Sequence, residues 1–181
     1  MTMRRRVPAL LALASLGFAA AHLAYEHFSG GVQSHHLLNN PDLPAVSNWL
    51  GLIALPLLGW MLGVRIRNHL ASSTRPGMSA GMWPGLAGGL LYGAAMAVSF
   101  ELDASAVTSG LFIGLLLFAV ALPVYRAEYV FGFIVGMTFT FGAVLPSLVA
   151  AVLAAVSVVV RLVFRGVAAV VRPSTRSRAA T

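Results

Sequence analysis

The sequence contains no cysteine and no lysine, and it has only five acidic residues among its 181 residues. Without cysteine the chain has no disulfide, no thiolate metal site and no cysteine nucleophile. Charged residues make up 9% of the chain, whereas an average soluble domain has about 25%. Hydrophobic residues make up 59%. A soluble domain of this composition could not cover its surface with polar groups, so the composition predicts an integral membrane protein.

Long apolar runs account for this composition. A helix crosses the hydrocarbon core of a bilayer, about 30 Å thick, with about 20 apolar residues. The last apolar stretch is long enough for two helices, with a break in the segment 142–147, where Pro146 can begin a new helix. We therefore predict an all-α integral membrane protein, a six-helix transmembrane bundle in which residues 1–181 form a single domain. The predicted helices are 7–26, 49–65, 81–100, 105–125, 128–144 and 146–164.

The positions of the arginines test this number of helices. With six spans, all twelve arginines fall on one side of the membrane, whereas five spans would divide them between the two sides. The positive-inside rule therefore favours six spans with both termini in the cytoplasm. We expect the membrane to be the inner membrane of a bacterium. The net charge of +7 is explained by these helix ends and by a basic cytoplasmic tail at 165–181, so nucleic-acid binding is not expected. We expect the tail to bind anionic lipid headgroups.

The N-terminal segment has a second interpretation. Three arginines, at 4–6, precede an apolar run, and the alanines at 19–21 resemble a signal-peptide cleavage site. The run from Val7 to Tyr25 is longer than the usual signal core of about 7–15 residues. This length favours an uncleaved first helix.

Glycines at positions 85, 89 and 93 recur every four residues in the third predicted helix, and Gly110 and Gly114 form a similar pair in the fourth. Small residues at this spacing allow two helix backbones to approach closely within a bilayer. We predict that these glycines pack helices together. The short connection at 101–104 further predicts that the third and fourth helices are antiparallel neighbours.

The segment 22–42 contains four of the five histidines and two of the five acids, but no arginine. It includes the end of the first helix and the beginning of a long outer loop, which continues to Ser47 and contains turn-forming residues such as Pro41. Loops of this length in compact domains are usually functional or mobile. We predict a structured loop that lies along the membrane interface or returns into the bundle, followed by a helix capped by Ser47 or Asn48.

Several of these side chains are predicted to meet at the outer membrane face. His22 and Glu26 are four residues apart and share one face of the first helix. Histidines at 35 and 36 return on the loop, and Glu101 arrives at the end of the third helix. Histidines and carboxylates together are ligands for zinc or non-haem iron, with copper and manganese as alternatives. The predicted metal ligands are His22, Glu26, His35, His36 and Glu101, with Glu26 and Glu101 also candidates for acid–base catalysis.

Three functions are compatible with such a site. The first is a metal-dependent membrane enzyme, a hydrolase or an oxygenase, that acts on a lipid-soluble or periplasmic substrate. The second is a transporter of a metal or a small solute, or an accessory subunit of one. The third is a non-catalytic membrane subunit that binds a partner protein through the outer loop. The partners expected are the lipid bilayer and another membrane protein or further copies of the chain in a homo-oligomer. The alternative to all three is that these residues bind no metal. The acids would then be solvated, and the histidines would be polar side chains at the membrane–water interface.

Overall fold

The computed structural model describes residues 2–36, 40–72 and 81–171. Within these ranges the chain forms six α-helices, which confirms the predicted all-helical class. The elements in chain order are α1 (Thr2–Phe28), β1 (Ser34–His36), β2 (Ala45–Ser47), the 3-10 helix η2 (Asn48–Leu50), α2 (Gly51–Ser72), α3 (Met82–Glu101), α4 (Ser105–Ala121), α5 (Ala127–Phe141) and α6 (Val144–Val171).

Three helical segments of the described chain are long and apolar enough to cross a membrane: Arg4–Phe28, Asn48–Ser72 and Val144–Ala169. The helices α4 and α5 are apolar but shorter. By length and composition the protein is therefore a membrane protein. The expectation that all six helices cross the bilayer stays a prediction.

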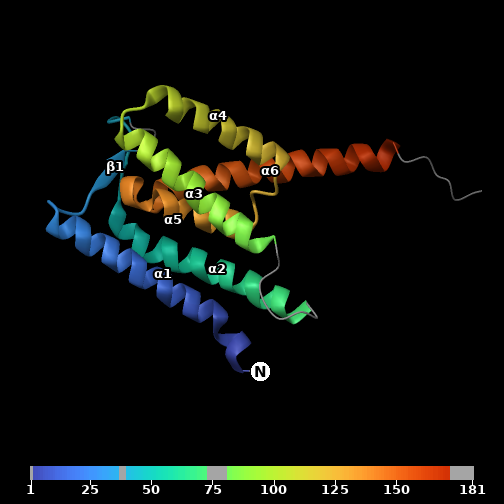
Figure 1. Ribbon diagram of the computed structural model, residues 1–181, viewed down its shortest axis with the longest axis horizontal. Coiled ribbons are helices and arrows are strands. Elements are labelled where there is room, and N and C mark those ends of the chain that lie inside the picture. The colour runs from blue at the N-terminus through green and yellow to red at the C-terminus, as the bar shows by residue number, and fades with distance from the viewer. Residues whose placement is uncertain (1, 37–39, 73–80, 172–181) are drawn as a thin grey trace, which may run out of the picture.

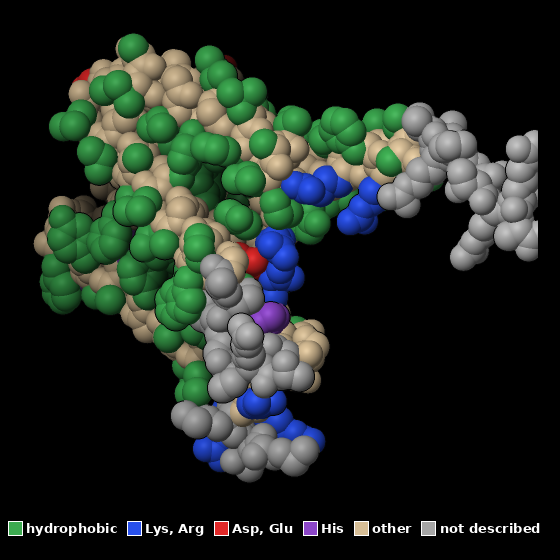
Figure 2. Space-filling model, turned by 45° about the vertical axis from the view of Figure 1, so that its right-hand side comes forward, with side chains coloured by type: hydrophobic (Ala, Val, Ile, Leu, Met, Phe, Trp, Pro, Cys, Tyr) green, Lys and Arg blue, Asp and Glu red, His purple; other side chains and the backbone are tan. Residues whose placement is uncertain are grey.

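Successive helices run in alternate directions, so the helix ends gather at two opposite ends of the molecule (Figure 1). At one end Arg4 Nη1 donates a hydrogen bond to the Leu70 carbonyl, which joins the start of α1 to the end of α2. Arg65 at the end of α2 pairs with Glu128 at the start of α5. We call this the arginine end, defined by Arg4, Arg65, Arg126 and Arg161. Figure 2 shows the arginines gathered along one side of the molecule, while hydrophobic side chains cover much of the remaining visible face.

The predicted close packing through glycines is confirmed for α3, and its partner is α5. A Cβ atom added at Gly89 would lie 2.6 Å from the Tyr129 carbonyl oxygen, and one added at Gly93 would collide with the Phe133 carbonyl. On α5, Gly132 and Gly136 meet the α3 backbone in the same way. The α4 glycines do not pack backbones together, because Gly110 has open space around it and Gly114 faces the Tyr92 hydroxyl.

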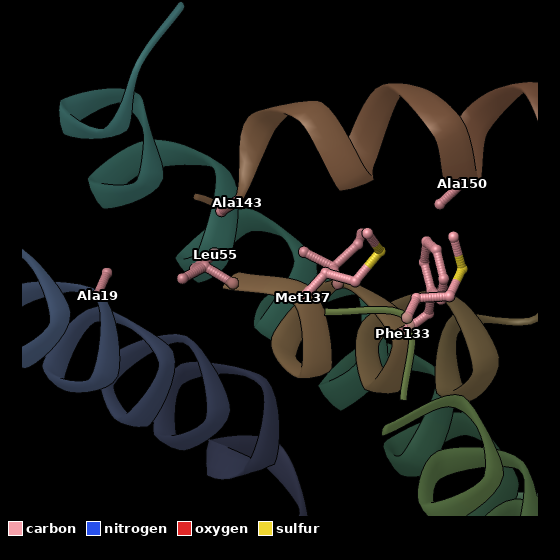
Figure 3. Packing of buried hydrophobic residues seen from close by; sticks show 8 residues of the cluster. Ala19, Leu55, Phe133, Met137, Ala143 and Ala150 are labelled. Atoms are coloured by element: carbon pink, nitrogen blue, oxygen red, sulfur yellow. The ribbon is translucent and has the colours of Figure 1, made fainter. Parts of the chain in front are cut away.

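The hydrophobic core lies where α1, α2, α3, α5 and α6 meet (Figure 3). Three small alanines and two flexible methionines pack there beside larger apolar side chains. The residues are Ala19, Leu55, Met96, Phe133, Ile134, Met137, Ala143 and Ala150. Many large apolar residues outside this cluster are exposed, as expected for helices that face lipid.

The long connection between α1 and α2 contains a small antiparallel hairpin. Its register pairs Ser34 with Ser47, His35 with Val46 and His36 with Ala45. The predicted cap is present, because the Ser47 hydroxyl accepts a bond from the Trp49 amide at 3.4 Å. The predicted structured loop is thus a hairpin followed by η2.

Some predicted features lie outside the described residues. They are four of the twelve arginines, Arg75, Arg172, Arg176 and Arg178, of which the last three belong to the predicted basic tail.

Candidate functional site

The site begins on the last turns of α1, where His22 and Glu26 are buried on the same face. Their side chains are 4% and 6% exposed, and Nε2 of His22 lies 3.6 Å from Oε1 of Glu26. The His22 ring also packs edge-to-face on Phe139 of α5, with ring centroids 5.1 Å apart. The spacing of four residues therefore brings imidazole and carboxylate together as predicted, inside the bundle rather than on its surface.

Both oxygens of Glu26 are held by neighbouring groups. Nδ2 of Asn48 donates a hydrogen bond of 2.5 Å to Oε1, and the backbone amide of Gln33 donates one of 3.4 Å to Oε2. Asn48 is itself buried, and its backbone amide bonds to the Gln33 carbonyl. These bonds fix the carboxylate and join the end of α1 to the hairpin and to η2.

Asn48 is positioned from its other side by Gly142, the residue that ends α5. Gly142 has a positive φ of 65°, a conformation that favours glycine. A Cβ atom at this position would collide with the Asn48 carboxamide. The α5 terminus therefore approaches the Asn48 side chain more closely than any other residue type at position 142 would allow.

The two adjacent histidines of the hairpin point in different directions, because successive side chains of a strand alternate between its faces. His35 is partly buried, and its ring lies 6.4 Å from that of Phe141. His36 is exposed, and its Nδ1 lies 2.7 Å from the Leu43 carbonyl oxygen, which closes the hairpin. His35 is thus on the side of Phe141, while His36 supports the turn.

Two imidazole nitrogens at this end are buried without a partner. Nε2 of His22 and Nε2 of His35 have no hydrogen-bond partner among the described residues. Burial lowers the pKa of His35 below 6.5; the Glu26 carboxylate opposes this shift, and His22 adds to it. The neutral form of His35 is therefore favoured near neutral pH, with a lone pair available on the ring. We call His22, Glu26 and His35 the histidine site.

Glu101, the fifth predicted ligand, stands apart from this site. It follows Phe100, whose ring packs on Phe141 with centroids 4.7 Å apart, so it belongs to the same end of the molecule. Its side chain is exposed. Among the residues that the structure describes, no three His, Asp or Glu side chains are close enough to hold a metal ion together. The structure thus pairs His22 with Glu26 and places His35 within electrostatic range of both, and it leaves His36 and Glu101 exposed.

A second buried carboxylate lies at the arginine end. Glu128 is fully buried and accepts a bond of 2.5 Å from Nε of Arg65, with Nε of Arg126 at 3.8 Å from its other oxygen. Its position at the start of α5 also suits a negative charge, because a helix N-terminus carries a partial positive charge. Arg65 is the nearer of the two partners, although Arg126 is only two residues from Glu128 in the sequence.

The sequence prediction of this site missed Asn48 and Gly142. Asn48 is predicted only as a possible helix cap, and Gly142 only as part of a break between helices. A glycine that ends an apolar helix is a sequence signal for positive φ. It gives no indication that an asparagine side chain packs against it.

Known proteins do not indicate what this site does. No protein-family model, no curated protein and no solved structure matches the chain. Its function must therefore be argued from its own residues.

Proposed function

We propose that this chain is a multi-pass membrane protein that binds a divalent transition metal at its histidine site and uses it in catalysis. The proposal depends on two buried Nε2 atoms that have no hydrogen-bond partner among the described residues. That of His22 lies 3.6 Å from the Glu26 carboxylate, and that of His35 belongs to a ring within electrostatic range of the same carboxylate. Buried polar atoms in native proteins normally have a partner. Two imidazoles and one carboxylate form a ligand set used for non-haem iron, and the same residue types bind zinc.

The surroundings of the three side chains fit this role. Ligating carboxylates are commonly oriented by further hydrogen bonds, and Glu26 has two such donors, Asn48 and the Gln33 amide. A metal binds neutral imidazole, the form that burial favours for His35. Because the three side chains do not form a ready-made cage, metal binding requires His35 to move toward the pair on α1. The connection from α1 to the hairpin contains Gly30 and Gly31, both with positive φ.

Catalysis would follow from the small number of protein ligands. Three side chains leave coordination positions for water or substrate, as in catalytic rather than structural metal sites. Zinc there would lower the pKa of water for hydrolysis, whereas iron would support oxygenation. The site lies away from the arginine end, so in the predicted topology it faces the periplasm, at the level of the membrane interface. We propose a lipid-soluble or periplasmic substrate on this basis.

A transporter is less well supported. The buried ionisable side chains of the described residues are His22 and Glu26 at one end and Glu128 at the other. The helix α5 separates these ends by 15 residues, or about 22 Å. Because no buried ionisable side chain of the described chain lies between them, a path for an ion across the bundle lacks intermediate sites.

The test is metal analysis of the purified protein with matched histidine variants. We expect near-stoichiometric zinc or iron in the wild type, and its loss in His22→Ala and in His35→Ala. The controls are His27→Ala, an exposed position one turn further along α1, and His36→Ala, the exposed neighbour on the hairpin; both should retain the metal.

Two results would overturn the proposal. One is the absence of transition metal in the wild type together with no thermal shift on adding Zn²⁺ or Fe²⁺. The other is an equal loss of metal in the control variants, which would indicate non-specific binding by surface histidines. A hairpin that binds a partner protein would instead be indicated by co-purification that persists in His22→Ala and is lost when residues 34–47 are deleted.

A further inference from the structure

A cavity of about 390 Å³ lies between α3, α4, α5 and α6. Its volume falls within the range of about 300–1,000 Å³ that is typical of ligand pockets. Its lining is almost entirely apolar and includes Tyr92, Leu115, Phe118, Leu122, Tyr129 and Leu153. None of the residues of the histidine site lines it, so it is a separate feature of the fold.

Two neighbouring glycines of α3 that line the cavity have different surroundings. A Cβ atom at Gly89 would meet the α5 backbone, whereas one at Gly88 would find nothing within 4 Å. Gly88 is exposed, as are Phe118 and Leu122 on the α4 wall. The cavity is therefore reached from the outside of the bundle, where a membrane protein meets lipid chains.

One wall of the cavity continues into the connection between α4 and α5, and Arg161 of α6 lies against this connection. The Ser157 hydroxyl donates to the Leu122 carbonyl at 2.9 Å, and Nη2 of Arg161 donates to the Ala121 carbonyl at 3.3 Å. The Arg161 guanidinium also lies 6.0 Å from the centre of the Tyr125 ring. These contacts hold a cationic group beside the cavity.

The charge of Arg161 is not neutralised by the described part of the chain. Its guanidinium pairs with no carboxylate there, and its Nε is buried without a hydrogen-bond partner. By contrast, Arg65 and Arg126 share Glu128. A guanidinium with free donors is well suited to bind a phosphate group.

We propose that this cavity is a binding site for one anionic phospholipid, with an acyl chain between α3 and α4 and the phosphate at Arg161. The apolar lining and the opening to the outside fit the chain. The unpaired guanidinium at the α4–α5 connection fits the headgroup. A bound lipid would fill the space between α4 and the rest of the bundle.

The test uses the purified full-length protein and native mass spectrometry, with dioleoyl phosphatidylglycerol and dioleoyl phosphatidylcholine as probes. We expect the wild type to retain one phosphatidylglycerol at least tenfold more than phosphatidylcholine. Gly88→Leu should fill the cavity and reduce the retention of both lipids about tenfold, and Gly88→Ala should have a smaller effect. The matched control is Gly110→Leu, which also enters open space but on a part of α4 that does not line the cavity.

The headgroup is tested separately. Arg161→Gln should remove the preference for phosphatidylglycerol while retaining the chain-binding site, and Arg165→Gln, an exposed arginine one turn further along α6, should leave the preference unchanged. Thermal melting of each variant shows whether it is folded. The proposal is overturned if Gly88→Leu and Gly110→Leu retain lipid equally, or if Arg161→Gln and Arg165→Gln have the same headgroup preference.

Discussion

The side-chain amide of Asn48 donates a hydrogen bond of 2.5 Å to Oε1 of Glu26, which lies 22 residues earlier in the chain. Both side chains are almost completely buried. This contact joins the end of α1 to the start of the α2 segment and, with the bond from the Gln33 amide, sets the orientation of the carboxylate. The first prediction follows from it.

Asn48→Ala is expected to lower the free energy of unfolding by about 1–3 kcal/mol, because it leaves a buried carboxylate oxygen without its donor. Thermal melting in detergent measures the effect. Asn68→Ala removes an exposed asparagine from α2 and should change stability by less than about 0.5 kcal/mol. Equal melting temperatures for the two variants would show that the Glu26 contact contributes little to stability.

Gly142→Ala tests the close approach of α5 to Asn48. The substitution strains a positive φ, at a cost of about 1–3 kcal/mol, and adds a collision with the Asn48 side chain. In an Asn48→Ala background the collision is relieved, so the effect of Gly142→Ala should be smaller there than in the wild type.

Gly30→Ala is the matched control for the comparison of Gly142→Ala in the wild type and in the Asn48→Ala background. Gly30 also has a positive φ, but a Cβ atom there meets nothing within 4 Å. Its effect should therefore be the same with and without Asn48. Strictly additive effects of Gly142→Ala and Asn48→Ala would contradict the packing described above.

Arg65→Met is expected to cost about 1–3 kcal/mol of stability, because it removes the nearer donor of a fully buried carboxylate and leaves only the more distant Arg126. The double variant Arg65→Met with Glu128→Gln should recover most of this loss, since it removes both charges. Arg126→Met is the control. Arg126 lies further from Glu128, at 3.8 Å, and is 41% exposed, so its loss should cost less than about 1 kcal/mol.

Acidification should destabilise the folded protein through His35. Its pKa is lowered in the folded state by burial, so the unfolded chain binds the proton more readily below pH 6.5. The contribution of His35 to the free energy of unfolding is therefore fully present above pH 6.5. It decreases as the pH falls from 6.5 toward the lowered pKa. As the pH falls over this range, the melting temperature of the wild type should decrease relative to that of His35→Gln; parallel curves would argue against a shifted pKa.

The six-span topology is tested by reporter fusions. Fusions after Asp42 and Asp103 should report the outside of the cell, and fusions after Ser73 and Thr181 the cytoplasm, because the arginines gather at the ends that precede Ser73 and Thr181. An external signal at Ser73 would reverse the predicted orientation or reduce the number of spans.

The helices could be predicted from sequence because apolar length is a strong local signal. Their ends could not be placed as well. The helix α6 continues to Val171, beyond the predicted end at Phe164, since neither Arg165 nor Gly166 stops it. By contrast, α5 ends at Phe141, before the predicted end at 144, because Gly142 takes a positive φ.

The candidate site could be predicted only in part. The pairing of His22 with Glu26 follows from helical spacing, which is local. The hairpin has strands of three residues, too short to show an alternating pattern, so the sequence could not separate the inward His35 from the outward His36. The contact of Asn48 with Glu26 is tertiary and leaves no local signal. The glycines of α3 likewise predict a close partner without showing that it is α5.

The short length of α5 has a consequence for the electrical properties of the molecule. A helix of 15 residues is about 22 Å long, whereas the hydrocarbon core is about 30 Å thick. Its two ends lie at buried polar groups, Glu128 and the Gly142–Asn48 contact. In the predicted topology these two groups bound an apolar layer about 22 Å thick along α5, and a membrane voltage would fall over this shorter distance. The field acting along α5 would then be stronger than in the surrounding bilayer.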